Sequence, residues 1–182
     1  MGTENSNKER EALEFARLSH GSQTRKYRNE LYIEHPKRVA EIVRTVNHTS
    51  EMICAAYLHD VVEDTPISLK EIESKFGNII AKLVDELTDE YVKEKYPNLN
   101  RKIRKQKETE RQKIISNEAK TIKLADVIDN TPDISKNDPR FARRYIPEMA
   151  ALVKALKGGD PILWGRANQE VQLAAKNHSH RF

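Results

Sequence analysis

The chain has 182 residues, of which 33% are charged and 37% are hydrophobic, with a formal net charge of +4. This length predicts a single domain over residues 1–182 with a proper hydrophobic core. No apolar run is long enough to span a membrane, and the polar N-terminus lacks the apolar centre of a signal peptide. The moderate positive charge suits an anionic small molecule and does not require a nucleic acid. The single cysteine, Cys54, excludes disulfides within the chain and fits a cytoplasmic location.

Hydrophobic spacing predicts helices along most of the chain and no strands. After a frayed lead-in over residues 1–7, the expected helices cover residues 12–20, 35–46, 51–64, 69–76, 80–87, 101–113, 119–130, 149–156 and 164–174. Ser68 and Glu71 have the spacing of a capping box, which places a helix start there. The breaks between helices are too short for domain linkers, so the sequence predicts an all-α fold, one compact helical bundle.

The segment 55–66 carries ionisable residues of metal-site type within an apolar run. On a helix, His59 and Asp60 are neighbours, and Glu63 and Asp64 lie one turn further on. The apolar company predicts burial, where unpaired charges are costly and charges on a metal ion are compensated. The same residues also fit a buried histidine with satisfied hydrogen bonds beside a solvated helix end.

A catalytic metal site needs three or four ligands and an open position for water. His35 begins an apolar helix and Asp126 lies inside an apolar helical stretch, with Asn130 one turn beyond it. Each also fits a plainer role, a surface histidine and a salt-bridged aspartate. Mixed histidine and carboxylate ligands suit Mn²⁺, Fe²⁺, Zn²⁺ or Mg²⁺. The remaining histidines have weaker claims: we expect His20 to pair with carbonyls at a helix end, and we expect solvated side chains for His48, His178 and His180.

The order His35, His59-Asp60, Asp126 resembles the H…HD…D signature of the HD-domain metal phosphohydrolases. Four ordered segments extend the likeness to the hydrolase domain of RelA/SpoT proteins: residues 12–36, Leu58–Thr65, Phe76-Gly77 and Lys123–Asn130. The resemblance covers about residues 10–160. No synthetase or regulatory region follows, so the chain is similar to the small stand-alone alarmone hydrolases, such as the SpoT homologue of animals.

The resemblance implies a reaction and a role for each residue. The reaction is release of pyrophosphate from the ribose 3′ position of (p)ppGpp by a metal-activated water. The implied metal is Mn²⁺, held by His35, His59, Asp60 and Asp126, with Glu63 and Asp64 activating the water. The implied substrate contacts are Arg25 and Lys26 to the base, Asn130 to the sugar and Tyr145 to a further part of the nucleotide. Lys102 and Arg104, in a basic run, are weaker suggestions for pyrophosphate.

The sequence departs from the family after Asn130, where it continues Thr131-Pro132-Asp133. Pro132 is expected to end the helix early, and Asp133 falls where a base-contacting threonine is expected. Another nucleotide substrate, a nucleoside phosphate or NADPH, therefore stays open. A third hypothesis is a non-enzymatic helical module that uses the basic run over residues 101–107 to bind RNA or an acidic partner. A homo-oligomer is compatible with all of these hypotheses, and residues 91–118 fit either a lid or a fixed helix.

Overall fold

The computed structural model describes residues 2–179 and, of the side chains, those of residues 4–178. That part of the chain forms ten helices and no strand beyond an isolated antiparallel bridge between Thr24 and Leu31. The predicted all-α fold is confirmed. The chain divides into two compact units, residues 1–88 and residues 89–182. Among the described helices, none is both long enough and apolar enough to cross a bilayer.

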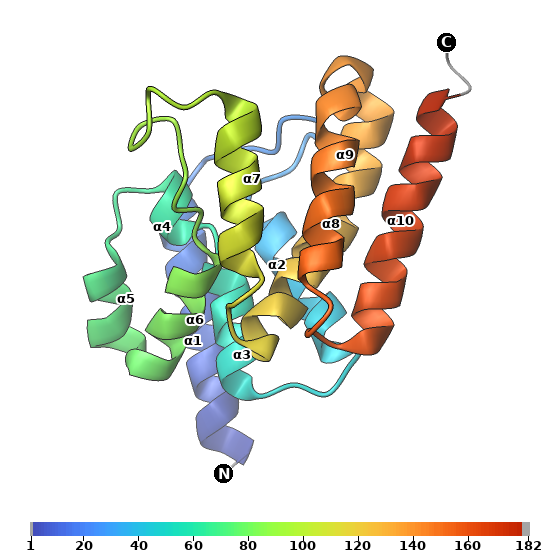
Figure 1. Ribbon diagram of the computed structural model, residues 1–182. Coiled ribbons are helices and arrows are strands. Elements are labelled where there is room, and N and C mark those ends of the chain that lie inside the picture. The colour runs from blue at the N-terminus through green and yellow to red at the C-terminus, as the bar shows by residue number, and fades with distance from the viewer. Residues whose placement is uncertain (1, 180–182) are drawn as a thin grey trace. The chain divides into compact units, whose positions relative to one another are not determined.

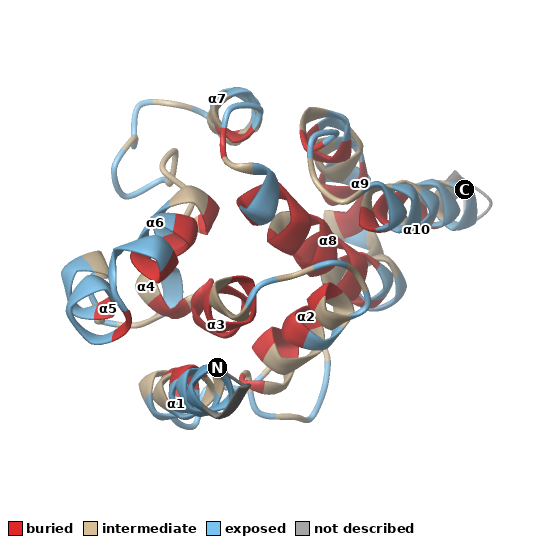
Figure 2. Cartoon of the chain, turned by 90° about the horizontal axis from the view of Figure 1, so that it is seen from below, coloured by how far each residue is buried: buried red, intermediate tan, exposed pale blue. Residues whose placement is uncertain are grey.

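The first unit is built around one apolar helix. Its helices are α1 (Gly2–His20), α2 (Glu34–Arg44), α3 (Ser50–Leu58), α4 (Val61–Asp64), α5 (Leu69–Phe76) and α6 (Asn78–Leu87). Helix α3 is apolar on every side and packs against α1, α2 and α6, so it is buried all round, as Figure 2 shows. Helix α1 already begins at Gly2, and the predicted frayed lead-in over residues 1–7 is therefore wrong for residues 2–7.

The predicted continuous helix over residues 51–64 is interrupted, because α3 ends at Leu58 and α4 begins at Val61. At this break a side chain contacts a backbone acceptor. The Nδ1 atom of His59 is 2.8 Å from the carbonyl oxygen of Ala56, which an unbroken helix would pair with the N–H of Asp60. His59 and Asp60 therefore stand at the joint between two helices, and not on one continuous helical face.

Short capping motifs fix the next turns of the first unit. Ser68 Oγ accepts from the N–H of Glu71, and the Glu71 carboxylate accepts from the N–H of Ser68 at 2.8 Å. The predicted capping box is thus confirmed. Gly77 joins α5 to α6 with φ of +90°, a backbone conformation that residues with a Cβ atom rarely adopt. Thr65 ends α4 in an extended conformation just before Pro66, as the sequence predicts.

The second unit is a group of four helices. They are α7 (Arg101–Gln112), α8 (Asn117–Asn137), α9 (Pro139–Ala155) and α10 (Pro161–Ser179). Helices α8, α9 and α10 pack against one another, and α7 packs on α9 (Figure 1). Helix α7 agrees with the predicted range to one residue, and a polar connection precedes it as expected.

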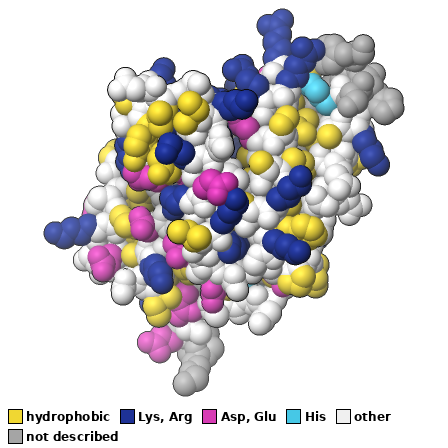
Figure 3. Space-filling view, in the orientation of Figure 1, with side chains coloured by type: hydrophobic (Ala, Val, Ile, Leu, Met, Phe, Trp, Pro, Cys, Tyr) yellow, Lys and Arg dark blue, Asp and Glu magenta, His cyan; other side chains and the backbone are white. Residues whose placement is uncertain are grey.

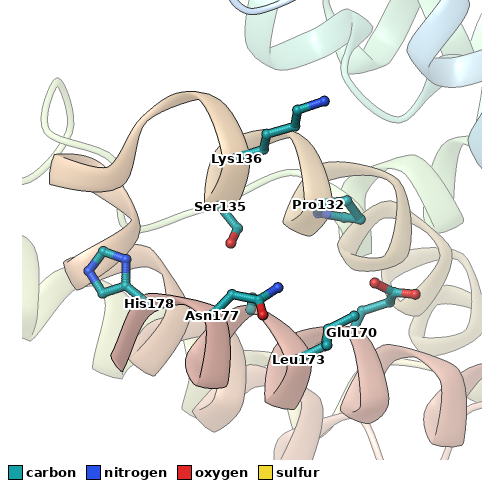
Figure 4. A pocket seen from close by; sticks show the side chains of 8 residues that line it. Pro132, Ser135, Lys136, Glu170, Leu173, Asn177 and His178 are labelled. Atoms are coloured by element: carbon teal, nitrogen blue, oxygen red, sulfur yellow. The ribbon is translucent and has the colours of Figure 1, made fainter. Parts of the chain in front are cut away.

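Helix α8 continues to Asn137, so the prediction that Pro132 ends it is wrong. Proline leaves the carbonyl of Ile128 without its helical donor, but packing against α9 and α10 outweighs that loss. Pro132 lines a cavity of about 460 Å³ between α8 and α10 (Figure 4). Helix α9 then starts at Pro139, a residue type that suits the first turn, so only Asp138 separates α8 from α9.

Candidate functional site

The site in the first unit begins with the orientation of His59. Its side chain is 1% exposed, and Nδ1 lies 2.8 Å from the carbonyl oxygen of Ala56, an atom that can only accept. In a neutral ring the proton is therefore on Nδ1, and Nε2 carries a lone pair. Nε2 lies 3.1 Å from Oδ2 of Asp60. A backbone carbonyl on the far nitrogen is the usual way in which a metal-binding histidine is oriented.

His35 approaches the same carboxylate oxygen from α2. Its Nε2 atom is 3.5 Å from Oδ2 of Asp60, its side chain is 1% exposed, and the ring centroids of His35 and His59 are 5.2 Å apart. Two ligands about 2.1 Å from one ion, at right angles, lie about 3 Å apart. The spacing and chemistry of these three groups therefore fit a divalent cation. Asp126, the remaining predicted ligand, belongs to the second unit.

The Asp60 carboxylate is kept ionised by its neighbours. Burial works to raise its pKa, but the facing imidazoles of His59 and His35 and a hydrogen bond from Tyr32 outweigh burial, and the pKa falls below its ordinary value. The Tyr32 hydroxyl donates to Oδ2 of Asp60 at 2.7 Å. Burial and the negative charges of Asp60 and Asp64 raise the pKa of Tyr32, so it stays a donor. Tyr32 orients the carboxylate, a role that the sequence did not reveal.

The two predicted water-activating carboxylates are on α4. Glu63 is exposed, and Asp64 is held at its backbone, where its N–H donates to the carbonyl of Asp60 at 2.9 Å. Asp64 is also exposed, but desolvation of its carboxyl and the nearby Asp60 charge raise its pKa. A raised pKa moves a carboxylate towards the range in which it accepts a proton effectively.

The predicted base-contacting residues lie in the loop between α1 and α2. The guanidinium of Arg25 is 5.9 Å from the ring centroid of Tyr32. Tyr32 is the residue whose hydroxyl donates to the Asp60 carboxylate. Lys26 turns instead to Tyr27, donating to its hydroxyl at 2.9 Å. Of the two cations, Arg25 is the one that contacts the ring of Tyr32.

In the second unit, three predicted site residues line one cavity of about 160 Å³: Asp126, Asn130 and Tyr145. Asn130 follows Asp126 by one helical turn, and its Nδ2 donates to Oδ1 of Asp126 at 2.5 Å. The hydroxyl of Tyr145, from α9, lies 3.5 Å from Oγ1 of Thr131. The structure thus brings the predicted metal ligand of α8 together with the predicted sugar and nucleotide contacts.

Two lysines in the same cavity were missed from the sequence. Lys123 Nζ lies 3.3 Å from Oδ2 of Asp126, and Lys105 Nζ lies 2.6 Å from Oδ2 of Asp89. By contrast, Lys102 is exposed and Arg104 donates to the carbonyl of Leu99, and neither lines the cavity. Helical spacing separates Lys102 from Lys105, because Lys105 shares a face of α7 with the buried Glu108 and Gln112. It does not separate Arg104, which lies one turn before Glu108.

Carboxylates of the second unit pair with two cations of the basic run on α7, Arg101 and Lys105. Arg101 forms a bidentate pair with Glu148 at 2.8 and 2.9 Å, and Arg111 pairs with Glu108. On the face drawn in Figure 3, cationic and anionic side chains are mixed. Binding of RNA or an acidic partner through the remaining cations of the run stays a hypothesis. The pair between Arg101 and Glu148 joins α7 to α9, which favours the fixed helix over the lid for residues 101–112.

The four histidines with weaker claims differ in their surroundings. His20 is buried, and its Nδ1 lies 2.9 Å from Oε1 of Gln23, so the expected pairing with helix-end carbonyls is wrong. Nδ1 of His48 lies 2.8 Å from the carbonyl oxygen of Val46. His178 is half-buried and not fully solvated as expected. His180 lies outside the described residues.

Comparison with known proteins identifies the scaffold. A family described as HD domain matches residues 12–156. The chain belongs to the HD-domain family. The two-histidine and aspartate cluster of the first unit is therefore the expected feature of an HD-domain protein, and its metal-ligand chemistry agrees with the family signature read from the sequence.

Individual relatives place this chain near one group of proteins within the HD-domain family. The chain is 34% identical to guanosine-3′,5′-bis(diphosphate) 3′-pyrophosphohydrolase MESH1 of Xenopus tropicalis, over 86% of this chain and 88% of that protein. It is 35% identical to the human protein of the same name, over 81% of this chain and 84% of that protein. A solved structure described as a metazoan ortholog of SpoT that hydrolyzes ppGpp is 32% identical, with a TM-score of 0.79, over 91% of this chain and 94% of that one. The predicted likeness to RelA/SpoT-type hydrolases is confirmed, and the predicted activity is the one for which these relatives are named.

Proposed function

We propose that this HD-domain chain is a metal-dependent hydrolase that removes pyrophosphate from the ribose 3′ position of (p)ppGpp. The observation that carries the proposal is the convergence of Nε2 of His59 and Nε2 of His35 on one carboxylate oxygen of Asp60. The names of the relatives, which describe that reaction, supply the substrate.

The proposed ligand set is His35, His59, Asp60 and Asp126, and the proposed ion is Mn²⁺. A divalent ion held there lowers the pKa of a bound water and neutralises negative charge on phosphoryl oxygens. Three of the ligands come from the first unit and Asp126 comes from α8. The ligands must be deprotonated for this role, and the Nδ1 bond of His59 to the carbonyl oxygen of Ala56 leaves the Nε2 lone pair for the ion.

Glu63 and Asp64 are proposed to take the proton of the attacking water. The raised pKa of Asp64 favours proton uptake there. Tyr32 contributes by holding the Asp60 carboxylate in one orientation through its 2.7 Å hydrogen bond. The products are pyrophosphate and a nucleotide with a free ribose 3′ hydroxyl.

The proposed substrate contacts are Arg25 and Lys26 for the base, Asn130 for the sugar and Tyr145 for a further part of the nucleotide. Lys105 and Lys123 line the cavity that holds the last two. They are better placed for pyrophosphate than Lys102 and Arg104, which that cavity does not include.

The substrate is tested by comparing kcat/KM for ppGpp with the values for NADPH and for a nucleoside triphosphate, all with Mn²⁺ present. We expect ppGpp to be preferred and pyrophosphate to be released. A preference for either of the other nucleotides would keep the HD-domain chemistry and reject the alarmone. Asp133, which is 7% exposed on α8 where the family has a threonine, would then be the first residue to examine for altered base recognition.

We also propose a partner, a cellular location and an oligomeric state for the enzyme. The partner is a small-molecule nucleotide, and neither nucleic acid nor a membrane is needed for activity. A cytoplasmic location agrees with the single, buried and free thiol of Cys54. A homo-oligomer is compatible with the proposal and is tested by light scattering of the purified protein.

A further inference from the structure

His20 is a buried histidine next to the proposed site with no part in it so far. It is the last residue of α1, its side chain is 3% exposed, and its ring packs on that of Tyr32 with centroids 4.7 Å apart. Gly21 follows with φ of +52°, which reverses the chain. This turn brings Gln23 back to His20, where Nδ1 of His20 and Oε1 of Gln23 are 2.9 Å apart.

The hydrogen bonds of Gln23 fix the tautomer of His20. Nε2 of Gln23 donates to the backbone carbonyl of Asp64 at 2.8 Å. Because that carbonyl only accepts, the amide nitrogen must face it and the amide oxygen must face His20. Nδ1 of His20 therefore carries the proton in the neutral ring. Nε2 of His20 is buried, carries the lone pair, and has no hydrogen-bond partner among the described residues.

The backbone of Gln23, whose side chain contacts Asp64, is held in place by two hydrogen bonds. Its N–H donates to the carbonyl of His20 at 3.0 Å, and its own carbonyl accepts from the N–H of Tyr32 at 2.8 Å. The backbone of Gln23 is thus held by hydrogen bonds at its N–H and at its carbonyl, and only the side chain can change conformation. Gln23, Tyr32 and Asp64 then line one cavity of about 290 Å³, together with Thr24.

We propose that His20 and Gln23 are positioning residues for Asp64. The N–H of His20 fixes the amide of Gln23, and that amide fixes the last carbonyl of α4, so that the Asp64 carboxylate is presented to the attacking water in one direction. The inference rests on the proposed function, in which Asp64 takes the proton. Neither residue touches the substrate or the reacting atoms in this account.

Four variants separate the two hydrogen bonds. Gln23→Leu removes both bonds, and Gln23→Glu keeps an acceptor for His20 but loses the donor to Asp64. His20→Phe keeps a ring against Tyr32 and loses the donor to Gln23. His20→Asn loses the ring and keeps a side-chain N–H near the position of Nδ1, so it serves as the conservative replacement.

The measurement is kcat and KM for ppGpp at saturating Mn²⁺, together with the thermal midpoint of each variant. We expect kcat to fall about 10- to 100-fold in Gln23→Leu, Gln23→Glu and His20→Phe, with KM within about threefold of wild type. His20→Asn should recover most of kcat. A purely structural role predicts a lower midpoint without this separation of kcat from KM. Unchanged kcat in Gln23→Glu and His20→Phe, or a change confined to KM, would overturn the positioning role.

A second measurement needs no turnover. Long-range ¹H–¹⁵N correlation spectra of the wild-type protein report which ring nitrogen of each histidine is protonated. We expect the Nδ1–H tautomer for His20, and an Nε2–H tautomer would overturn the hydrogen-bond assignment. If wild-type protein leaves ppGpp intact, the proposed function fails and the role of Asp64 fails with it. If wild type is active and the variants are equally active, only the positioning role fails.

Discussion

Tyr32 is not a proposed metal ligand, but its hydroxyl orients one through a 2.7 Å hydrogen bond to Asp60. Tyr32→Phe removes this bond and keeps the ring against His20. We expect the dissociation constant for Mn²⁺ to rise about 10- to 100-fold, as for other groups that orient metal ligands. Titration of the metal-free protein with Mn²⁺ measures this, and an unchanged affinity would show that Asp60 needs no such support.

Glu63 and Asp64 have a different role and should give a different result. Glu63→Gln and Asp64→Asn remove a proton acceptor while keeping size and shape. We expect kcat on ppGpp to fall roughly 10²- to 10⁴-fold in at least one of them, with Mn²⁺ affinity unchanged. Glu73→Gln, an exposed glutamate of α5, is the matched control and should be fully active. Wild-type kcat in both test variants would remove this pair from the mechanism.

The residue types of the site could be predicted from the sequence, but the residues that orient them could not. His59-Asp60 stand together in the chain, and His35 is conspicuous at the start of an apolar helix. The roles of Tyr32 and Gln23 depend on a loop that returns to the end of α1 and reaches α4, which no local pattern announces. Lys105 was missed because its basic run was read as one block and not by helical face.

At the scale of elements, helix ends set by local chemistry were predicted well. The capping box at Ser68 is such a case, and it gives a test. Ser68→Ala removes the acceptor of the Glu71 N–H, and we expect the free energy of unfolding to fall by about 1 kcal/mol. Urea denaturation measures this, with Ser74→Ala inside α5 as the control. A loss equal to that of the control would mean that the cap contributes nothing.

Helix ends set by packing or by a single side chain were predicted poorly. The joint between α3 and α4 depends on the His59 ring reaching the carbonyl of Ala56. The continuation of α8 past Pro132 depends on contacts with α9 and α10. Proline chemistry alone correctly favours a break there, and long-range packing outweighs it. Local signals therefore predicted helices throughout but missed the joint between α3 and α4 and the continuation of α8.

At the scale of the whole molecule, buried ion pairs should make stability depend on pH. Burial works to raise the pKa of Asp89, but the charges of Lys123, Lys105 and Arg111 outweigh it and lower the pKa. In the unfolded chain an aspartate has a pKa of about 3.9. Because the folded pKa is lower, the ionised Asp89 contributes stability above about pH 4, and this contribution is lost as the pH falls further.

The test is urea denaturation of wild type and Asp89→Asn between about pH 6 and pH 3. We expect wild type to be the more stable at pH 6 and the gap between the two proteins to narrow below about pH 4. Asp60 shifts in the same direction, but it is present in both proteins and its contribution cancels. A gap that stays constant over this range would contradict the assigned direction for Asp89.

The most direct test of the proposed enzyme is pyrophosphate release from ppGpp by the purified protein, with and without Mn²⁺. Asp126→Ala and the exposed-residue control Glu118→Ala, both on α8, are assayed alongside. The account predicts release only with the ion, an active control, and a loss of about a hundredfold or more in Asp126→Ala. Release that persists after chelation of all metal, or wild-type turnover by Asp126→Ala, would contradict it.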